Sequence, residues 1–183
     1  MVKAVLLDRD GTLNVEKGYV FRIEDLELLP GTIEALRLLT SQGIKIFIIT
    51  NQAGIAKGYY TEEQFKEITR YMTDLFRDKG ITVEKTLYCP HHPEGTVPEY
   101  TRTCECRKPK TLLIESVLAE NHYRSDEVML IGDKNSDIDA GDKLGLRTYL
   151  VLTGYGLEHQ RDTHATYIAQ DLLGAVRHLL NIQ

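Results

Sequence analysis

Apolar and polar residues come in blocks along this chain, and the blocks predict strands that alternate with helices. Residues 44–51 are almost continuously apolar and β-branched, as expected of a strand that is buried on both faces. Residues 3–8 and 127–133 are short apolar runs that end in an aspartate. Two further strands are predicted at residues 83–89 and 147–154.

Helical spacing of apolar residues separates these strands. In residues 61–80, Thr61 is followed by acidic residues and then by apolar residues spaced for one helix face, a typical helix start and amphipathic pattern. The predicted helices cover residues 31–43, 61–80, 110–122, 136–145 and 169–181.

The alternation of strands and helices predicts an α/β fold with a parallel sheet and helices on both faces. The chain has 183 residues without a repeat or a linker-like segment, which suits a single domain over residues 1–183. Ligands of such sheets bind beyond the carboxyl ends of the strands.

The net charge and the N-terminal residues limit the kinds of partner that this chain is expected to have. The formal net charge is −5, which disfavours nucleic acid as a partner. The N-terminus reaches charged residues after too few apolar positions for a signal peptide or a membrane span. We therefore expect a cytoplasmic protein without a nucleic-acid or membrane partner. We also expect it to be a monomer.

Polar residues follow three of the predicted strands. Asp8 ends the first strand, Thr50 and Asn51 end the second, and Asp133 ends the run at 127–133. Capping of the helices that follow would explain any of these residues taken singly. Parallel strands would bring all of them to one edge of the sheet, where a shared site explains the set better.

Clustered carboxylates at this edge could hold Mg²⁺, which prefers oxygen ligands. A carboxylate in line with a phosphorus atom could then attack it and form an aspartyl phosphate. Asp10, two residues after Asp8, could protonate the leaving oxygen and later deprotonate water. Arg107 and Lys134 would add the positive charge that a phosphate group requires, although either could be an ordinary surface charge.

A second cluster lies in residues 89–106, which contain all three cysteines of the chain. The residues Cys89, His91, Cys104 and Cys106 form a CxH…CxC set that suits a tetrahedral, structural Zn²⁺ site. The loop has little to bury, so a metal would order it. His92 is an alternative ligand to His91, and three reduced cysteines without metal are the simpler alternative.

Four motifs of the chain resemble those of the haloacid dehalogenase (HAD) superfamily phosphatases, in the same order. They are "DRDGT" (8–12), "TNQ" (50–52), Lys108 in "CRKP", and "GDKNSD" (132–137). The resemblance covers residues 4–155 and implies a Rossmann-like HAD fold. The segments between the motifs are too short for a separate cap domain.

The resemblance also implies roles for individual residues. Asp8 would be the nucleophile and Asp10 the general acid and base. Thr50 and Asn51 would hold the transferring phosphoryl group, and Lys108 would neutralise charge on the nucleophile and the phosphate. Mg²⁺ would be bound by Asp8, the carbonyl of Asp10, and Asp133. The residues implied to contact substrate are Glu16, Lys17, Gly18, Tyr19, Thr50, Asn51, Gln52, Ala53, Arg107, Lys108 and Lys134.

Within the superfamily, the zinc loop that runs into "CRKPK" resembles a branch that contains heptose-bisphosphate and histidinol-phosphate phosphatases. Three stretches favour the heptose-bisphosphate phosphatases within this branch: "EKGYV" (16–20), residues 50–65 and "CPHHPEG" (89–95). The expected activity is therefore Mg²⁺-dependent removal of the C7 phosphate from a heptose 1,7-bisphosphate. Histidinol phosphate is the alternative substrate, and a non-enzymatic phospho-receiver module is the alternative from another class.

Overall fold

The structure is a computed structural model, and it describes residues 1–182 of the chain. Six strands form one parallel sheet in the order β3-β2-β1-β4-β5-β6, which confirms the α/β fold predicted from the sequence. The strands are β1 (Ala4–Leu7), β2 (Lys45–Asn51), β3 (Val83–Cys89), β4 (Val128–Gly132), β5 (Arg147–Val151) and β6 (Tyr167–Ala169).

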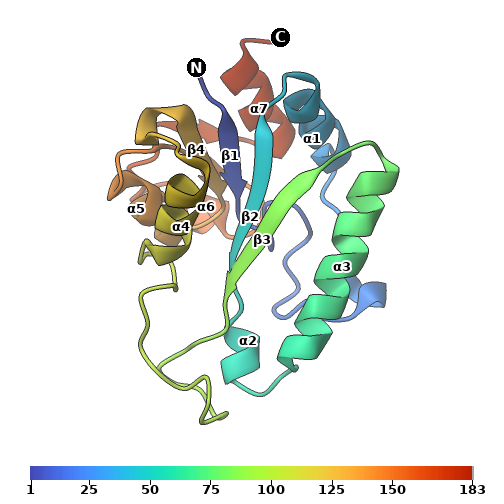
Figure 1. Ribbon diagram of the computed structural model, residues 1–183, viewed down its shortest axis with the longest axis vertical. Coiled ribbons are helices and arrows are strands. Elements are labelled where there is room, and N and C mark those ends of the chain that lie inside the picture. The colour runs from blue at the N-terminus through green and yellow to red at the C-terminus, as the bar shows by residue number, and fades with distance from the viewer. Residues whose placement is uncertain (183) are drawn as a thin grey trace.

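Helices cover both faces of the sheet (Figure 1). One face packs against α1 (Thr32–Ser41), α3 (Glu62–Asp78) and α7 (Leu172–Leu180). The other face packs against α4 (Leu112–Asn121) and α5 (Asn135–Asp142). The short elements are α2 (Ala53–Ala56), α6 (Gly156–His159) and two 3₁₀ turns, η1 (Ile23–Asp25) and η2 (Ser125–Glu127).

Strand β1 shows how the apolar residues divide between the two faces. Val5 and Leu7 contribute to the core beneath α1 and α7, whereas Ala4 and Leu6 contribute to the core beneath α4. All four side chains are fully buried, because β1 lies in the middle of the sheet. Each buried leucine contributes about 1.5–3 kcal/mol, so this strand anchors the aspartate that follows it.

Helix α3 begins where the sequence predicts. The backbone N–H of Gln64 donates to Thr61 Oγ1 (3.2 Å), and the Thr61 N–H donates back to Gln64 Oε1 (2.8 Å). This capping box satisfies backbone donors that the first turn leaves free. Within residues 1–182, no helix is both long enough and apolar enough to cross a bilayer.

The secondary structure predicted for the C-terminal part of the chain is partly wrong. Ala169 belongs to the edge strand β6 and not to the predicted helix 169–181. Helix α7 starts at Leu172 because the side chain of Asp171 caps it, accepting a hydrogen bond from the Gly174 N–H (2.8 Å). The strand predicted over 147–154 also ends early, at Val151.

The carboxyl ends of the central strands lie side by side. Leu7 pairs with Ile48 of β2 and with Ile131 of β4, and the Asp8 N–H continues the ladder to the Ile131 carbonyl (3.0 Å). In Figure 1, α2 and the yellow-green loop after β3 extend beyond this edge of the sheet. Residues from these loops can therefore close over the strand ends.

Candidate active site

The structure brings together the aspartates that follow two central strands, as predicted from the sequence. Asp8 follows β1 and Asp133 follows β4, and both side chains are buried. Carboxylate oxygens of Asp8, Asp133 and a third residue, Asp137, all lie within 4.8 Å of one another. Asp137 is in the first turn of α5, and sequence reasoning missed it although it closes the "GDKNSD" motif.

Lys108 neutralises part of this acidic cluster. Its Nζ lies 2.7 Å from Asp8 Oδ1 and 2.6 Å from Asp137 Oδ1, and it donates to the Ile49 carbonyl at 2.6 Å. All three ammonium hydrogens thus have acceptors. Burial lowers the pKa of Lys108, but Asp137 and Asp8 outweigh it and raise the pKa above its ordinary value. The lysine is therefore a permanent positive charge beside Asp8.

Asn51 holds the backbone of Lys108 in place. Its side-chain amide donates to the Lys108 carbonyl and accepts from the Lys108 N–H, both at 3.0 Å. These paired hydrogen bonds join the end of β2 to a residue that lies 57 positions later in the chain. The geometry therefore gives Asn51 a positioning contact as well as a place in the wall of the cavity.

Asp133 has the features of a cation ligand. Its Oδ2 accepts a hydrogen bond from the Tyr155 N–H (2.8 Å), but its buried Oδ1 has no hydrogen-bond partner among the described residues. Burial, followed by the negative charge of Asp8, raises the pKa of Asp133 to about 8. A divalent cation held by Asp8 and Asp133 would occupy Oδ1 and stabilise the ionised form, so these residues fit Mg²⁺.

Gly11 and Gly154 make room for the carboxylate of Asp133. A Cβ atom on Gly11 would lie 2.7 Å from Asp133 Cγ, and a Cβ on Gly154 would lie 3.0 Å from the same atom. Both glycines also have positive φ angles, 86° and 55°, which side chains rarely adopt. The glycine of the "DRDGT" motif is therefore needed for close packing as well as for the turn.

Asp10 is held as an ionised carboxylate. Arg9 contacts both of its oxygens, with Nε 3.0 Å from Oδ2 and Nη2 2.9 Å from Oδ1. Asn14 and Gln52 each donate a further bond at 3.0 Å. Burial opposes the charge, but Arg9 and these hydrogen bonds outweigh it and lower the pKa of Asp10. The resting site therefore holds Asp10 in the state of a general base.

A cavity of about 380 Å³ opens above these residues. Nearly all of the residues predicted to contact substrate line it, and Lys17 is the exception. The ammonium of Lys17 turns away to the Asp25 carbonyl (3.2 Å) and to Glu27 (2.9 Å). The predicted residues in the wall are Glu16, Gly18, Tyr19, Thr50, Asn51, Gln52, Ala53, Arg107, Lys108 and Lys134.

The cavity wall also contains polar residues that were not predicted from the sequence to contact substrate. Lys57, Tyr60 and His92 are among them. Neither Lys57 nor Arg107 has a carboxylate within 4.0 Å among residues 1–182. Burial, then the positive charges of Arg107 and Lys57, lower the pKa of His92. Lys57 and Arg107 form a second cationic region of the cavity apart from Lys108, and the lowered pKa favours the neutral form of His92 beside them.

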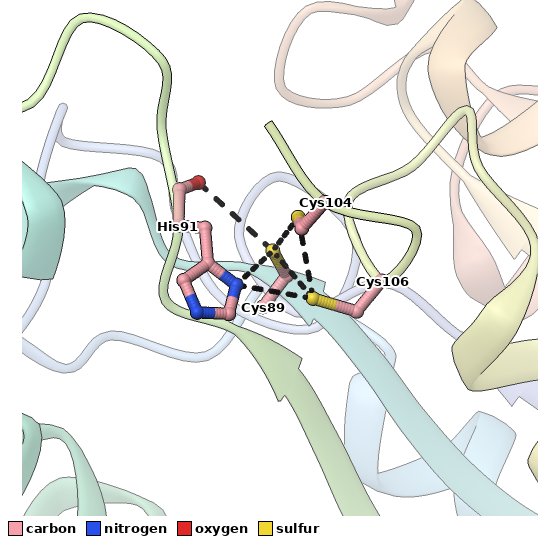
Figure 2. Close-up of side chains that lie close together, drawn as sticks. All are labelled: Cys89, His91, Cys104 and Cys106. Carbon is pink, nitrogen blue, oxygen red and sulfur yellow. Dashed lines mark hydrogen bonds between the residues drawn. The ribbon is translucent and has the colours of Figure 1, made fainter. Parts of the chain in front are cut away.

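The cysteine cluster is close to this region. Figure 2 shows Cys89, Cys104, Cys106 and the Nδ1 atom of His91 directed toward one point. The sulfur atoms lie 3.1–3.4 Å apart, and Nδ1 lies 3.3 Å from Cys106 Sγ and 3.8 Å from Cys89 Sγ. Three sulfurs and one imidazole nitrogen are the ligands that a structural Zn²⁺ prefers. These residues fit zinc.

The two neighbouring histidines have different surroundings. His92 lies outside the cysteine cluster, and its Nδ1 accepts a hydrogen bond from the Glu94 N–H (3.1 Å). The Nε2 atom of His91 lies 2.7 Å from Arg102 Nη2. A guanidinium can only donate, so this contact requires an unprotonated Nε2. A zinc ion bound to Nδ1 of His91 would leave the imidazole proton on Nε2. The hydrogen bond from Arg102 to Nε2 would then be lost.

Comparisons with known proteins agree with this arrangement. A family model described as HAD-hydrolase-like matches residues 105–175. The chain is 38% identical, over 94% of both chains, to D-glycero-beta-D-manno-heptose-1,7-bisphosphate 7-phosphatase of Pasteurella multocida. It is 42% identical to the corresponding alpha-heptose enzyme of Photorhabdus laumondii, over 84% of this chain and 85% of that enzyme.

A solved structure shares the whole fold. It is D,D-heptose 1.7-bisphosphate phosphatase from B. bronchiseptica, complexed with magnesium and phosphate. The TM-score is 0.89 at 27% identity, covering 98% of this chain and 99% of that one. The similarity therefore extends over both the sheet and the loops that surround the cavity.

Proposed function

The chain belongs to the family of HAD-like phosphatases that these relatives represent, and on that basis we propose that it removes the C7 phosphate of D-glycero-D-manno-heptose 1,7-bisphosphate. The relatives carry the name of this activity and are 37–42% identical to the chain. The histidinol-phosphate alternative is not favoured, since these relatives are named for the heptose substrate. Membership in a phosphatase family equally disfavours a non-enzymatic receiver module.

The proposed reaction starts with attack by Asp8. One carboxylate oxygen of Asp8 bonds to the phosphorus of the C7 phosphate, and the bond from phosphorus to the sugar oxygen breaks. Asp10 gives a proton to the sugar oxygen, which leaves as the C7 hydroxyl. Asp10 then takes a proton from water, the water oxygen attacks the phosphorus, and phosphate is released from Asp8.

Asp10 must be protonated for the first half of this cycle, whereas the resting site lowers its pKa. A phosphate dianion bound next to Asp10 would raise that pKa, because a neighbouring negative charge disfavours the carboxylate. Binding of substrate would therefore supply the shift that converts Asp10 from base to acid. Once Asp10 has given its proton to the sugar oxygen, it is again a carboxylate that can take a proton from water.

Lys108 provides positive charge next to Asp8, and a bound metal ion would add to it. Lys108 is already paired with Asp8 at 2.7 Å and is placed to stabilise the phosphoryl group that Asp8 receives. Mg²⁺ held by Asp8, Asp133 and the carbonyl of Asp10 would, when bound, neutralise charge on the phosphoryl oxygens. The unpartnered Oδ1 of Asp133 supports this cation.

The observation that supports a bisphosphate is the second cationic region, formed by Lys57 and Arg107. Only one phosphate of the substrate can reach Asp8. The other would lie toward these two residues, which lack a carboxylate partner in the part of the chain described. Arginine can bind phosphate oxygens through two parallel hydrogen bonds, whereas the amine of histidinol phosphate would be repelled.

A paired kinetic measurement tests this proposal. The values of kcat/KM are measured with Mg²⁺ for both anomers of the heptose bisphosphate and for histidinol phosphate, and ³¹P NMR identifies the phosphate released. We expect loss of the C7 phosphate and a preference for the bisphosphate of about 30- to 150-fold, equivalent to about 2–3 kcal/mol from a charged contact. A preference for histidinol phosphate would reverse the assignment.

A further inference from the structure

The side chain of Gln52 connects two residues of the site. Its Nε2 donates to Asp10 Oδ2 at 3.0 Å and to Thr50 Oγ1 at 2.8 Å. Because a carboxylate can only accept hydrogen bonds, the NH₂ end of the Gln52 amide must face Asp10. Thr50 Oγ1 accepts one of these bonds, which leaves the threonine O–H free to donate toward the cavity.

The other end of the same amide is held by Tyr60. The Tyr60 hydroxyl donates to Gln52 Oε1 at 2.5 Å. Burial raises the pKa of Tyr60 above its ordinary value, so the phenol keeps its proton and remains a donor. An amide rotated by half a turn would lose the bond from Tyr60 and would place Oε1 against the carboxylate of Asp10.

The ring of Tyr60 is itself fixed by its neighbours. It is 5% exposed and stacks on Phe21, with ring centroids 5.1 Å apart and an interplanar angle of 11°. Gly54 of α2 lets the ring approach closely, since a Cβ atom there would lie 2.7 Å from Tyr60 Cζ. The hydroxyl therefore has a defined position relative to Gln52.

We propose that Tyr60 is a positioning residue of the phosphatase, which acts through Gln52 to orient Asp10 and the hydroxyl of Thr50. This inference rests on the proposed phosphatase function, because Asp10 and Thr50 are given their roles there. The phenol fixes the amide, and the amide fixes two groups of the proposed catalytic site. Tyr60 itself makes no contact with the reacting atoms in this arrangement.

The first test removes the hydroxyl and keeps the ring. Tyr60→Phe should lower kcat about threefold to tenfold, the effect of one lost hydrogen bond, and should change KM by less than about twofold. Tyr59→Phe is the matched control, because Tyr59 is an adjacent exposed tyrosine outside the cavity wall. Its kcat should equal that of the wild type.

A double-mutant cycle separates positioning from general destabilisation. If Tyr60 acts through Gln52, the Tyr60→Phe change should lower kcat no further in a Gln52→Ala background. Wild-type kcat in Tyr60→Phe, or losses that multiply in full in the double variant, would overturn the inference.

A measurement without substrate gives an independent result. In ¹⁵N NMR spectra, the side-chain NH₂ hydrogens of Gln52 should exchange slowly with water in the wild type and faster in Tyr60→Phe. Equal rates of hydrogen exchange in both proteins would show that Tyr60 does not fix the side-chain amide of Gln52. If the wild type failed to hydrolyse sugar bisphosphates, the proposed function would fail. The NMR comparison would still decide whether Tyr60 fixes the amide of Gln52.

Discussion

Lys108 and Asp8 are separated by 100 positions in the sequence, yet their charged atoms lie 2.7 Å apart in a buried site. The same ammonium is 2.6 Å from Asp137. Two carboxylates therefore share one lysine, and the site carries excess negative charge until a cation or a protonated carboxyl balances it. This arrangement explains why the same cluster is suited both to a metal ion and to a nucleophilic aspartate.

Removal of Lys108 should affect both stability and turnover. Lys108→Met leaves Asp8 and Asp137 buried without their shared counter-ion, which should cost about 3–5 kcal/mol of unfolding free energy and lower kcat by about 10² or more. Urea unfolding and steady-state kinetics measure the two effects. The control is Lys110→Met, an exposed lysine 3.5 Å from Glu105, which should change stability by less than about 0.5 kcal/mol. Equal stability of both variants would contradict the shared ion pair.

The cysteine cluster should contain one zinc ion per chain, bound through His91. His91→Ala or Cys106→Ser should release the metal, loosen the loop over residues 89–106 and make it sensitive to protease. His92→Ala should retain zinc, because its imidazole lies outside the cluster. Elemental analysis of the purified variants measures the zinc content. Retention of zinc by His91→Ala together with its loss from His92→Ala would reverse the ligand assignment.

Stabilisation by Mg²⁺ should increase with pH. The folded-state pKa of Asp133 is raised to about 8 from the ordinary value of 3.8, so the metal-free folded state binds this proton more tightly than the unfolded chain does. Its contribution to stability is present at low pH and is lost as the pH rises through about 8. Mg²⁺ requires the ionised carboxylate.

The measurement compares Tm with and without Mg²⁺ at several pH values. At a fixed Mg²⁺ concentration, the rise in Tm should grow between about pH 6 and about pH 8. Asp133→Asn should show a smaller rise without this trend. An increase in Tm that stays constant across the range would show that Asp133 does not control binding of the cation.

Lys57 should recognise the phosphate that is not removed. Lys57→Gln should lower kcat/KM for the bisphosphate about tenfold, the size of a lost charged hydrogen bond, mainly by raising KM. The same variant should hydrolyse heptose 7-phosphate at the wild-type rate, since that substrate lacks the second phosphate. Lys79→Gln, an exposed lysine just after α3, is the charge-matched control. An equal loss on both substrates would assign Lys57 a different role.

The sequence could predict five of the six strands and the polar residues at the carboxyl ends of the central ones. Apolar runs identified β1, β2 and β4, and the rule for parallel sheets placed Asp8, Thr50 and Asp133 at one edge. The cysteine spacing identified the four residues that cluster in the loop after β3. These signals are local, because each depends on a few adjacent positions.

The remainder of the site depends on contacts that local patterns do not reveal. Asp137 reaches Lys108 from the first turn of a helix, where several polar side chains are equally good candidates in sequence. Lys57 and Tyr60 lie around the end of α2, a helix too short to give a periodic signal. Lys17 sits in the same predicted substrate segment as Glu16 and Tyr19, but its own ion pair turns it away.

The most direct test of the account is to trap the phosphoryl group on Asp8. The enzyme is mixed with heptose bisphosphate and Mg²⁺, quenched in acid during turnover, and digested for mass spectrometry. The peptide containing Asp8 should gain the mass of one phosphoryl group, and Asp8→Asn should show neither this adduct nor turnover. An Asp8→Asn enzyme that still hydrolyses the C7 phosphate at a rate close to wild type would contradict the mechanism.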